Sequence, residues 1–294
     1  MTVLVGYLAG KCGHAPLNLA VEAARALNTS IVVAAVVPRP WMTPSPARID
    51  AEFAAYATQL GTDSEREARS YLDSIAPEID VSYLPVPSRT AGDGLMEAVE
   101  NVQPEVLVVG SSASGALGQV VLGSTTDWLL HASPVPVAVS PRGYRMSKAG
   151  RLKRITCAYS GTEGSERVVE RVAAITERLD VEFRVVSYAI RGRTMFPPQV
   201  GLHAEDTLLD SWAGQLRELT NKLRTDGIVG TDAELEVITG NGWDGALDAT
   251  DWEDGDLLAL GTTSRRTIAG VFLGSHGAKI IRHSPVPVLV LPGG

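Results

Sequence analysis

The sequence contains little cysteine. Of its 294 residues only two are cysteines, Cys12 and Cys157, which are too few for a disulfide framework. Cys157 lies in an apolar, strand-like run at residues 154–159. The simpler interpretation is therefore a reduced thiol packed in a core, and the alternative is a redox role.

Long apolar runs and an excess of basic residues are also absent. No run reaches the ~18 consecutive apolar residues that a membrane helix needs. The N-terminus passes directly into a strand-like segment, without the basic region and apolar stretch of a signal peptide. We therefore expect a cytoplasmic protein with no membrane partner. Lysine and arginine total 26 against 34 acidic residues, a net charge of −8, so no nucleic-acid partner is expected either.

The sequence offers no metal or catalytic motif. None of the five histidines has the spacing of a metal site. The acidic stretch at residues 244–256 lacks the order of ligands found in an EF-hand, which favours a solvated surface. The Gly-Ser pairs at 123 and 274 are not nucleophile elbows of the type G-x-S-x-G. We therefore expect no metal and no enzyme activity.

What the sequence does contain is an internal repeat. Residues 122–141 read LGSTTDWLLHASPVPVAVSP, and residues 273–292 read LGSHGAKIIRHSPVPVLVLP. The two segments are 151 residues apart, far more than the ~20–50 residues of a solenoid repeat. The chain therefore consists of two copies of one domain. We assign residues 1–141 to the first domain, the polar and basic residues 142–153 to a linker, and residues 154–294 to the second domain.

Each half alternates short apolar runs with helical patterns. The predicted strands are 2–8, 31–37, 80–86, 105–110 and 135–140 in the first half, and 154–159, 181–189, 233–239, 256–261 and 286–291 in the second. The predicted helices are 15–27, 46–75, 92–102, 124–132, 165–179, 203–226, 243–250 and 275–283. This alternation predicts an α/β protein made of two tandem, doubly wound, Rossmann-like domains, each with a five-stranded parallel sheet.

Proline marks the last strand of each half. The motif Pro-Val-Pro-Val occurs at 134–137 and at 285–288. Because proline cannot donate a hydrogen bond to a neighbouring strand, both strands are expected at a sheet edge. An apolar edge must be covered or paired. We expect strands 135–140 and 286–291 to pair with each other within the chain, and a homodimer is a further option.

Small residues follow the fourth strand of each half and lead to a helix start. Backbone amides in such a loop can approach an anion, and the positive end of the helix dipole favours it. Ligands of open α/β sheets bind beyond the carboxyl ends of the strands, where the strand order reverses. The candidate ligand-binding residues are Gly110, Gly123 and Ser124 in the first half, and Ser160, Gly261, Ser264, Arg265, Gly274 and Ser275 in the second. The simpler interpretation is ordinary turn and N-cap chemistry.

These loops resemble those of the universal stress protein family, and the resemblance extends over almost the whole chain in two copies. The nucleotide-binding branch of that family has the pattern G-x2-G-x9-G-[ST]. Gly110 with Gly123-Ser124, and Gly261 with Gly274-Ser275, match its first and last parts. The middle glycine is replaced by Ala113 and by Ser264. The resemblance implies a stress-response protein that binds an adenine nucleotide such as ATP.

The resemblance weakens after the first strand of each half. Family members that bind ATP usually have an aspartate there, at the adenine end of the site. The matching positions are Leu8, which cannot hydrogen-bond through its side chain, and Ser160, which can. Because the second half also has Arg265 after its loop, we expect its site to be the better one. The alternatives are an interaction module of the same fold without a ligand and, as the lowest-ranked option, a slow ATP hydrolase.

Overall fold

The computed structural model describes residues 1–11, 13–39, 49–112, 117–191, 202–262 and 275–293. The chain divides into two compact units, residues 1–151 and residues 152–294. Over the described ranges, no helix has both the length and the apolar character needed to cross a bilayer.

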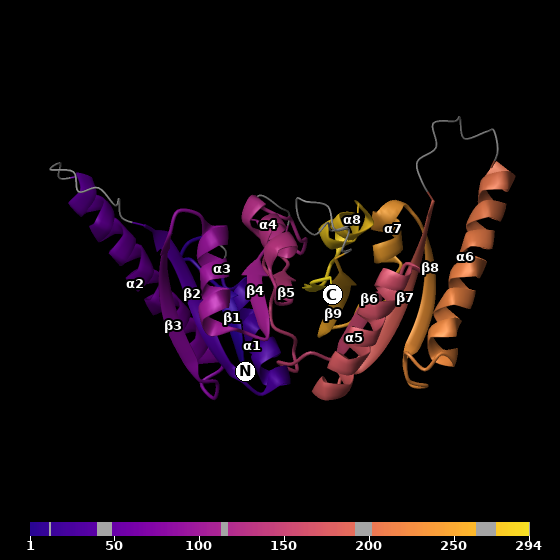
Figure 1. Cartoon of the computed structure of the whole chain (residues 1–294), viewed down its shortest axis with the longest axis horizontal. Coiled ribbons are helices and arrows are strands. Elements are labelled where there is room, and N and C mark those ends of the chain that lie inside the picture. The colour runs from indigo at the N-terminus through magenta and orange to yellow at the C-terminus, as the bar shows by residue number, and fades with distance from the viewer. Residues whose placement is uncertain (12, 40–48, 113–116, 192–201, 263–274, 294) are drawn as a thin grey trace. The chain divides into compact units, whose positions relative to one another are not determined.

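The first unit is a parallel sheet with helices on both faces (Figure 1). Its elements in chain order are β1 (Thr2–Gly6), α1 (Ala15–Leu27), β2 (Ser30–Pro38), α2 (Ile49–Ile75), β3 (Val81–Ser88), α3 (Ala91–Val102), β4 (Val106–Gly110), α4 (Ser124–Ala132) and β5 (Val137–Ser140). The strand order is β3-β2-β1-β4-β5, and each neighbouring pair is parallel. The order reverses between β1 and β4.

The second unit repeats this arrangement. Its elements are β6 (Arg154–Ala158), α5 (Glu163–Leu179), β7 (Glu182–Arg191), α6 (Leu202–Thr225), β8 (Glu234–Asn241), α7 (Gly242–Asp248), β9 (Asp256–Gly261), α8 (Ser275–His283) and β10 (Val288–Leu291). The strand order is β8-β7-β6-β9-β10, again with parallel pairs. The predicted fold class, two tandem doubly wound α/β domains, is confirmed.

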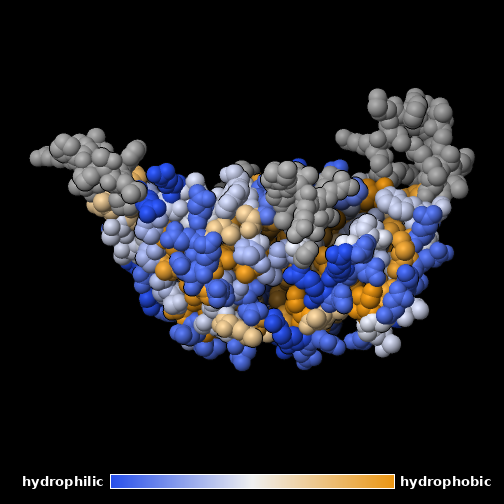
Figure 2. Space-filling model, in the orientation of Figure 1, coloured by the Kyte–Doolittle hydropathy of each residue, from blue (hydrophilic) through white to orange (hydrophobic). Residues whose placement is uncertain are grey.

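The helices of the first unit are divided between the two faces of its sheet. Tyr71 of α2 donates a hydrogen bond to Asn18 of α1 (2.7 Å), so these two helices share one face. Gly94 of α3 lies against Val36 of β2 on the other face. The strand between the layers is apolar on both sides, and residues 3–5 of β1 are fully buried. Figure 2 shows a largely hydrophilic surface with smaller hydrophobic patches on the visible side of each unit.

The observed elements begin and end close to the predicted positions. The terminal strands are the instructive exception, because β5 begins at Val137 and β10 at Val288, each directly after the second proline. The missing N–H of Pro136 explains the late start, although its carbonyl still accepts a bond from Leu107 (2.9 Å). Each of these strands lies at one end of the strand order of its own unit. The pairing of one with the other stays a prediction.

Part of the predicted linker is bound to the first unit. Glu22 of α1 is fully buried and accepts hydrogen bonds from the Tyr144 hydroxyl (2.6 Å) and from the Ser147 amide (2.8 Å). Asn18 donates to the carbonyl of Tyr144 (3.0 Å), and Arg25 donates to the carbonyl of Gly150 (3.0 Å). Residues 144–150 therefore form a strap across α1.

The acidic stretch at residues 244–256 is not uniformly solvated, and the expectation is wrong for Asp256. Its side chain has no exposed surface and accepts two hydrogen bonds from Arg154 (3.0 and 2.7 Å). Arg184 of β7 is also buried and lies 3.7 Å from the same carboxylate. The aspartate is buried because it opens β9 in direct register with Arg154 of β6. It is a structural ion pair inside the second unit.

Candidate functional site

The loop after β4 is fixed by its own serine. Ser111 is buried, and its hydroxyl oxygen accepts a hydrogen bond from the amide of Val121 (2.7 Å). The amide of Ser112 donates to the carbonyl of Val121 (2.8 Å). These bonds hold both ends of the loop together. As a result, the end of β4 lies beside the start of α4, and Thr126 of that helix reaches the carbonyl of Gly110 (3.5 Å).

The first turn of α4 is open toward the loop. Gly123 is the N-cap residue and offers no capping side chain. The helical hydrogen bonds begin with the amide of Asp127, which donates to the carbonyl of Gly123 (2.9 Å). The amides at positions 124–126 therefore precede the first intrahelical donor, as at any helix start. The hydroxyl of Ser124 is exposed and makes no hydrogen bond within the described residues. This turn can receive an anion.

The fold needs glycine at only one of two loop positions, Gly261 and Gly123. A Cβ on Gly261 would lie 2.1 Å from the Val168 side chain of α5, so packing alone requires glycine at the end of β9. A Cβ on Gly123 would meet only the side chain of Ser112, at an ordinary 3.6 Å. Gly123 also has a φ of −80°, which any residue adopts. The fold explains Gly261 but not Gly123.

This difference predicts unequal effects of alanine. Gly261→Ala should lower the free energy of unfolding by about 1–3 kcal/mol, because the added methyl group overpacks the contact with Val168. Gly123→Ala should change it by less than about 0.5 kcal/mol, as for an exposed position without a special conformation. Urea denaturation of both variants checks the pair. A Gly123→Ala variant that is as unstable as Gly261→Ala would show that the fold itself requires this glycine.

The loops after β1 and β6 carry the residues at the adenine end of the proposed pattern. Leu8 is half-buried and lines a cleft between the strand ends and α2. Ser160 is exposed, and its hydroxyl lies 3.1 Å from the hydroxyl of Thr162, the N-cap of α5. Gly161 has a φ of +72° and lies beneath Leu219 of α6. The second unit therefore retains a polar atom where the first unit presents an apolar side chain.

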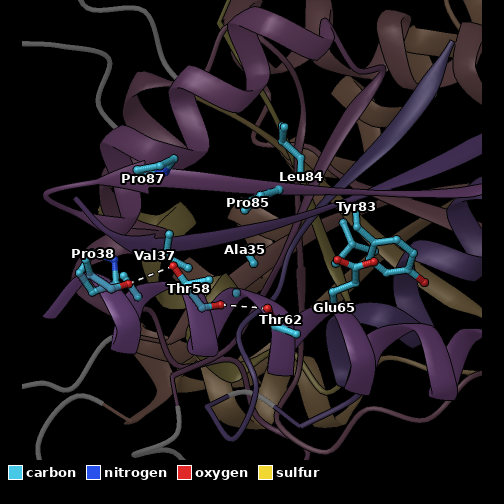
Figure 3. Close-up of a pocket in the computed structure, with 14 residues that line it drawn as sticks. Ala35, Val37, Pro38, Thr58, Thr62, Glu65, Tyr83, Leu84, Pro85 and Pro87 are labelled. Carbon is cyan, nitrogen blue, oxygen red and sulfur yellow. Dashed lines mark hydrogen bonds between the residues drawn. The ribbon is translucent and has the colours of Figure 1, made fainter. Parts of the chain in front are cut away.

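Two cavities lie beside α2, and neither was predicted from the sequence. One of about 320 Å³ lies between α2 and strands β2 and β3 (Figure 3). Its threonines, Thr58 and Thr62, donate to carbonyls of their own helix (3.0 and 3.1 Å), which leaves mainly apolar groups in the lining. This cavity does not suit an anion. The other, of about 690 Å³, is the cleft that contains Leu8.

The comparisons with known proteins agree with this architecture. The model of the universal stress protein family matches residues 1–141 and again residues 151–292. The chain belongs to the universal stress protein family. It is 54% identical over 293 residues to a universal stress protein of Mycobacterium tuberculosis, and the match covers 100% of both chains.

A solved universal stress protein shares the fold. A universal stress protein from Archaeoglobus fulgidus covers 100% of this chain and 98% of its own, with a TM-score of 0.62 and 18% identity. A universal stress protein solved in complex with cAMP covers 49% of this chain and 98% of its own, with a TM-score of 0.38 and 22% identity.

The structure describes only part of the site expected from the universal stress protein pattern. Gly110, Gly123 and Ser124 are brought together at the β4–α4 loop, and Gly261 ends β9. The remaining expected positions, Ala113, Ser264, Arg265 and Gly274, lie outside the described residues. Ser275 begins α8, but its side chain is not among those described. The site of the second unit is therefore a prediction.

Other reactive groups of this universal stress protein have structural roles. Complete burial raises the pKa of the Cys157 thiol to about 12, which fits the interpretation as a core thiol. His283 of α8 lies 2.5 Å from Asp244 of α7, a pair that the sequence did not reveal. This pair is partly exposed and joins two helices. Within the described ranges, no group of three or more metal-ligating side chains is present.

Proposed function

We propose that the chain is a non-catalytic, cytoplasmic stress-response protein that binds an adenine nucleotide of the ATP type. The phosphates would lie at the start of α4 in the first unit and at the start of α8 in the second. The observation that carries this proposal is Gly123, a glycine that neither packing nor backbone conformation requires, next to an uncapped helix start. Close approach of a ligand to the backbone is a physical reason for such a glycine.

The chemistry of the first-unit loop supports phosphate binding of modest strength. The first-turn amides and the Ser124 hydroxyl offer donors to an anion. Asp127, in the first turn of the same helix, opposes an anion, although it lies 3.9 Å from His131, which can offset its charge when protonated. The apolar side chain of Leu8 removes a hydrogen bond from the adenine end, and a site without that bond discriminates less among bases.

The second unit should bind the nucleotide more tightly. Ser160 keeps an exposed hydroxyl at the adenine end. Arg265 lies within the expected phosphate loop in the sequence, directly after Ser264, and an arginine fork matches the geometry of phosphate oxygens. Against this, Ser264 brings a Cβ to a position where the nucleotide-binding pattern has glycine.

Calorimetric titration with ATP tests both parts of the proposal. The wild type should release heat with a Kd in the micromolar to millimolar range, and Gly274→Val should remove the tighter component. Gly123→Val should remove only the weaker one, because its β-branched side chain crowds the loop. If Gly123→Val alone abolishes binding, the ranking of the units is reversed. If millimolar ATP gives neither heat nor a change in Tm, the chain is an interaction module of the same fold.

Catalysis is not part of this proposal. Nucleotide hydrolysis needs an acidic group or a metal near the phosphates. The aspartate expected after the first strand is replaced by Leu8 and Ser160. Incubation of the protein with ATP and Mg²⁺, followed by measurement of released phosphate, should give the rate of the buffer alone. Turnover that Gly274→Val abolishes would instead assign a slow hydrolase.

A further inference from the structure

The cavity of about 320 Å³ between α2 and strands β2 and β3 is larger than core packing ordinarily leaves. Protein interiors are close-packed and contain few voids larger than a water molecule. A liquid gives each water-sized group about 30 Å³, so a cavity of this volume accommodates roughly ten such groups. Among its described lining residues Glu65 alone is charged, and that carboxylate is bound by Arg69 (2.8 Å). The cavity is therefore mainly apolar and large enough for a small molecule.

Small side chains on α2 leave this space open. Ala54, Ala57 and Gly61 line the cavity at spacings of three and four residues, which places them on one face of the helix. Gly61 lies in the interior of the helix, where only proline is less favourable than glycine. A Cβ at this position would lie 3.5 Å from Val37 and 3.9 Å from Pro85, both ordinary contacts. Packing therefore does not require glycine here, although glycine weakens the helix.

The second copy of the domain shows that the fold can fill the same layer. Helix α6 packs against both β7 and β8, whereas α2 packs mainly against β2. Leu209 and Leu216 of α6, seven residues apart, belong to a packed hydrophobic cluster with Val237 of β8. At the same spacing α2 has Ala54 and Gly61. The cavity is therefore a consequence of the residues of the first unit and not of the fold.

The cavity is elongated and opens at the edge of the sheet. Its lining on α2 runs from Ala54 to Glu65, about 16 Å at a rise of 1.5 Å per residue. Thr62 on the helix side and Pro85 on the strand side are both exposed (Figure 3). β3 is the last strand in the order of its unit, and Pro85 and Pro87 disfavour the addition of a further strand. A ligand can therefore enter between α2 and β3.

We propose that this cavity binds a neutral, medium-chain aliphatic molecule, namely a fatty alcohol of roughly ten carbon atoms. A long, narrow space suits an extended alkyl chain, because each CH₂ group that it covers is removed from water. No lysine or arginine is among the described lining residues, and Glu65 repels an anion, so the ligand is neutral. Its hydroxyl group would remain at the mouth, in contact with water. Leu8 and Gly123 do not line the cavity, and the proposal does not depend on nucleotide binding.

Calorimetric titration with 1-decanol tests the proposal, with 1-hexanol and decanoate as matched probes. From hexanol to decanol the Kd should fall by up to about fourfold for each added CH₂ group. Decanoate has the same chain length but carries a carboxylate, and it should bind roughly tenfold more weakly than decanol or worse. Gly61→Leu fills the space with a branched side chain and should weaken decanol binding by roughly tenfold or more.

Two further variants show whether decanol binds in this cavity. Gly214 is also a glycine in the interior of a helix, but a Cβ there would meet open space. Gly214→Leu in α6 should therefore leave the Kd of decanol unchanged. Ala54→Leu narrows the other end of the cavity and should weaken binding, which keeps the test decisive if Gly61→Leu does not fold. Near-ultraviolet circular dichroism must show that each variant is folded, because partly unfolded chains also bind apolar molecules.

A competition experiment separates this cavity from the proposed nucleotide site. Millimolar ATP should leave the Kd of decanol unchanged, and so should Gly123→Val. Loss of ATP binding in that variant would then leave this proposal standing. Competition between ATP and decanol would overturn it, because the alkyl chain would then lie in the nucleotide site. Absence of heat with decanol, or equal binding by the wild type, Gly61→Leu and Ala54→Leu, would also overturn it.

Discussion

Asp256→Ala is expected to lower the free energy of unfolding by about 3–5 kcal/mol, the range for a buried ion pair that loses one partner. The Asp256 carboxylate accepts two hydrogen bonds from Arg154 and a third from the amide of Glu253 (2.9 Å). Arg154 and Arg184 also both donate to the carbonyl of Asp251 (2.9 Å each). Without Asp256, two largely buried guanidinium groups would share one site and lack their central anion. Guanidinium chloride denaturation measures the loss.

The expected loss of stability in Asp256→Ala depends on the burial of that carboxylate. A matched variant at an exposed carboxylate tests this dependence. Glu234 also lies near Arg154, at 3.6 Å, but its side chain is 50% exposed. Glu234→Ala should lower the free energy of unfolding by no more than about 1 kcal/mol, as for exposed pairs. In Asp256→Leu combined with Arg184→Met, one buried cation disappears together with the anion, so this variant should be more stable than Asp256→Ala. Similar losses for Asp256→Ala and Glu234→Ala would contradict the description of a buried cluster.

The sequence contained signals for this buried ion-pair cluster. They lie in the position of each charge within a strand, and the local composition does not reveal them. Asp256 belongs to an acidic stretch, which by itself favours solvent exposure. However, Asp256 and Arg154 each open an apolar strand of the predicted parallel sheet, and Arg184 lies inside another. Charges in such strands need partners in neighbouring strands. The strand order places β6 between β7 and β9, which makes these partners neighbours although they are far apart in the chain.

The candidate site could be predicted from the sequence only in part, because some of its residues are close in the sequence and others come together only in the folded sheet. Gly110, Gly123 and Ser124 were found because a loop between adjacent elements is local in sequence. The cleft that contains Leu8 was missed, because its basic residues Lys11, Arg39 and Arg89 follow three separate strands and come together only when the parallel sheet forms. A basic residue after each of the first three strands was a usable signal. The aromatic residues of α2 that line the same cleft, Phe53 and Tyr56, gave no such signal, because their direction depends on how that helix packs.

The strap at residues 144–150 could not be predicted either, because basic and glycine-containing residues between two domains are typical of a free linker. Glu22 holds the strap on the first unit, since the buried Glu22 carboxylate accepts hydrogen bonds from both the Tyr144 hydroxyl and the Ser147 amide. The apolar neighbours of Glu22 in α1 gave no sign of that partner. We therefore expect the segment to be protected by the first unit as long as this carboxylate is present.

Glu22→Ala should release the strap and expose it to trypsin, which cleaves after lysine and arginine. The change should lower the free energy of unfolding by at least about 2 kcal/mol, because each buried donor left unpaired costs about 1–3 kcal/mol. Cleavage after Arg145 and Lys148 should become several-fold faster than in the wild type and divide the chain into halves of similar mass.

Tyr144→Phe keeps the Ser147 bond and should give an intermediate rate. Glu97→Ala removes an exposed carboxylate from α3 and should leave the rate unchanged. If Glu22→Ala is cleaved no faster than Glu97→Ala, the carboxylate does not hold the strap, and the bonds from Asn18 and Arg25 must be sufficient.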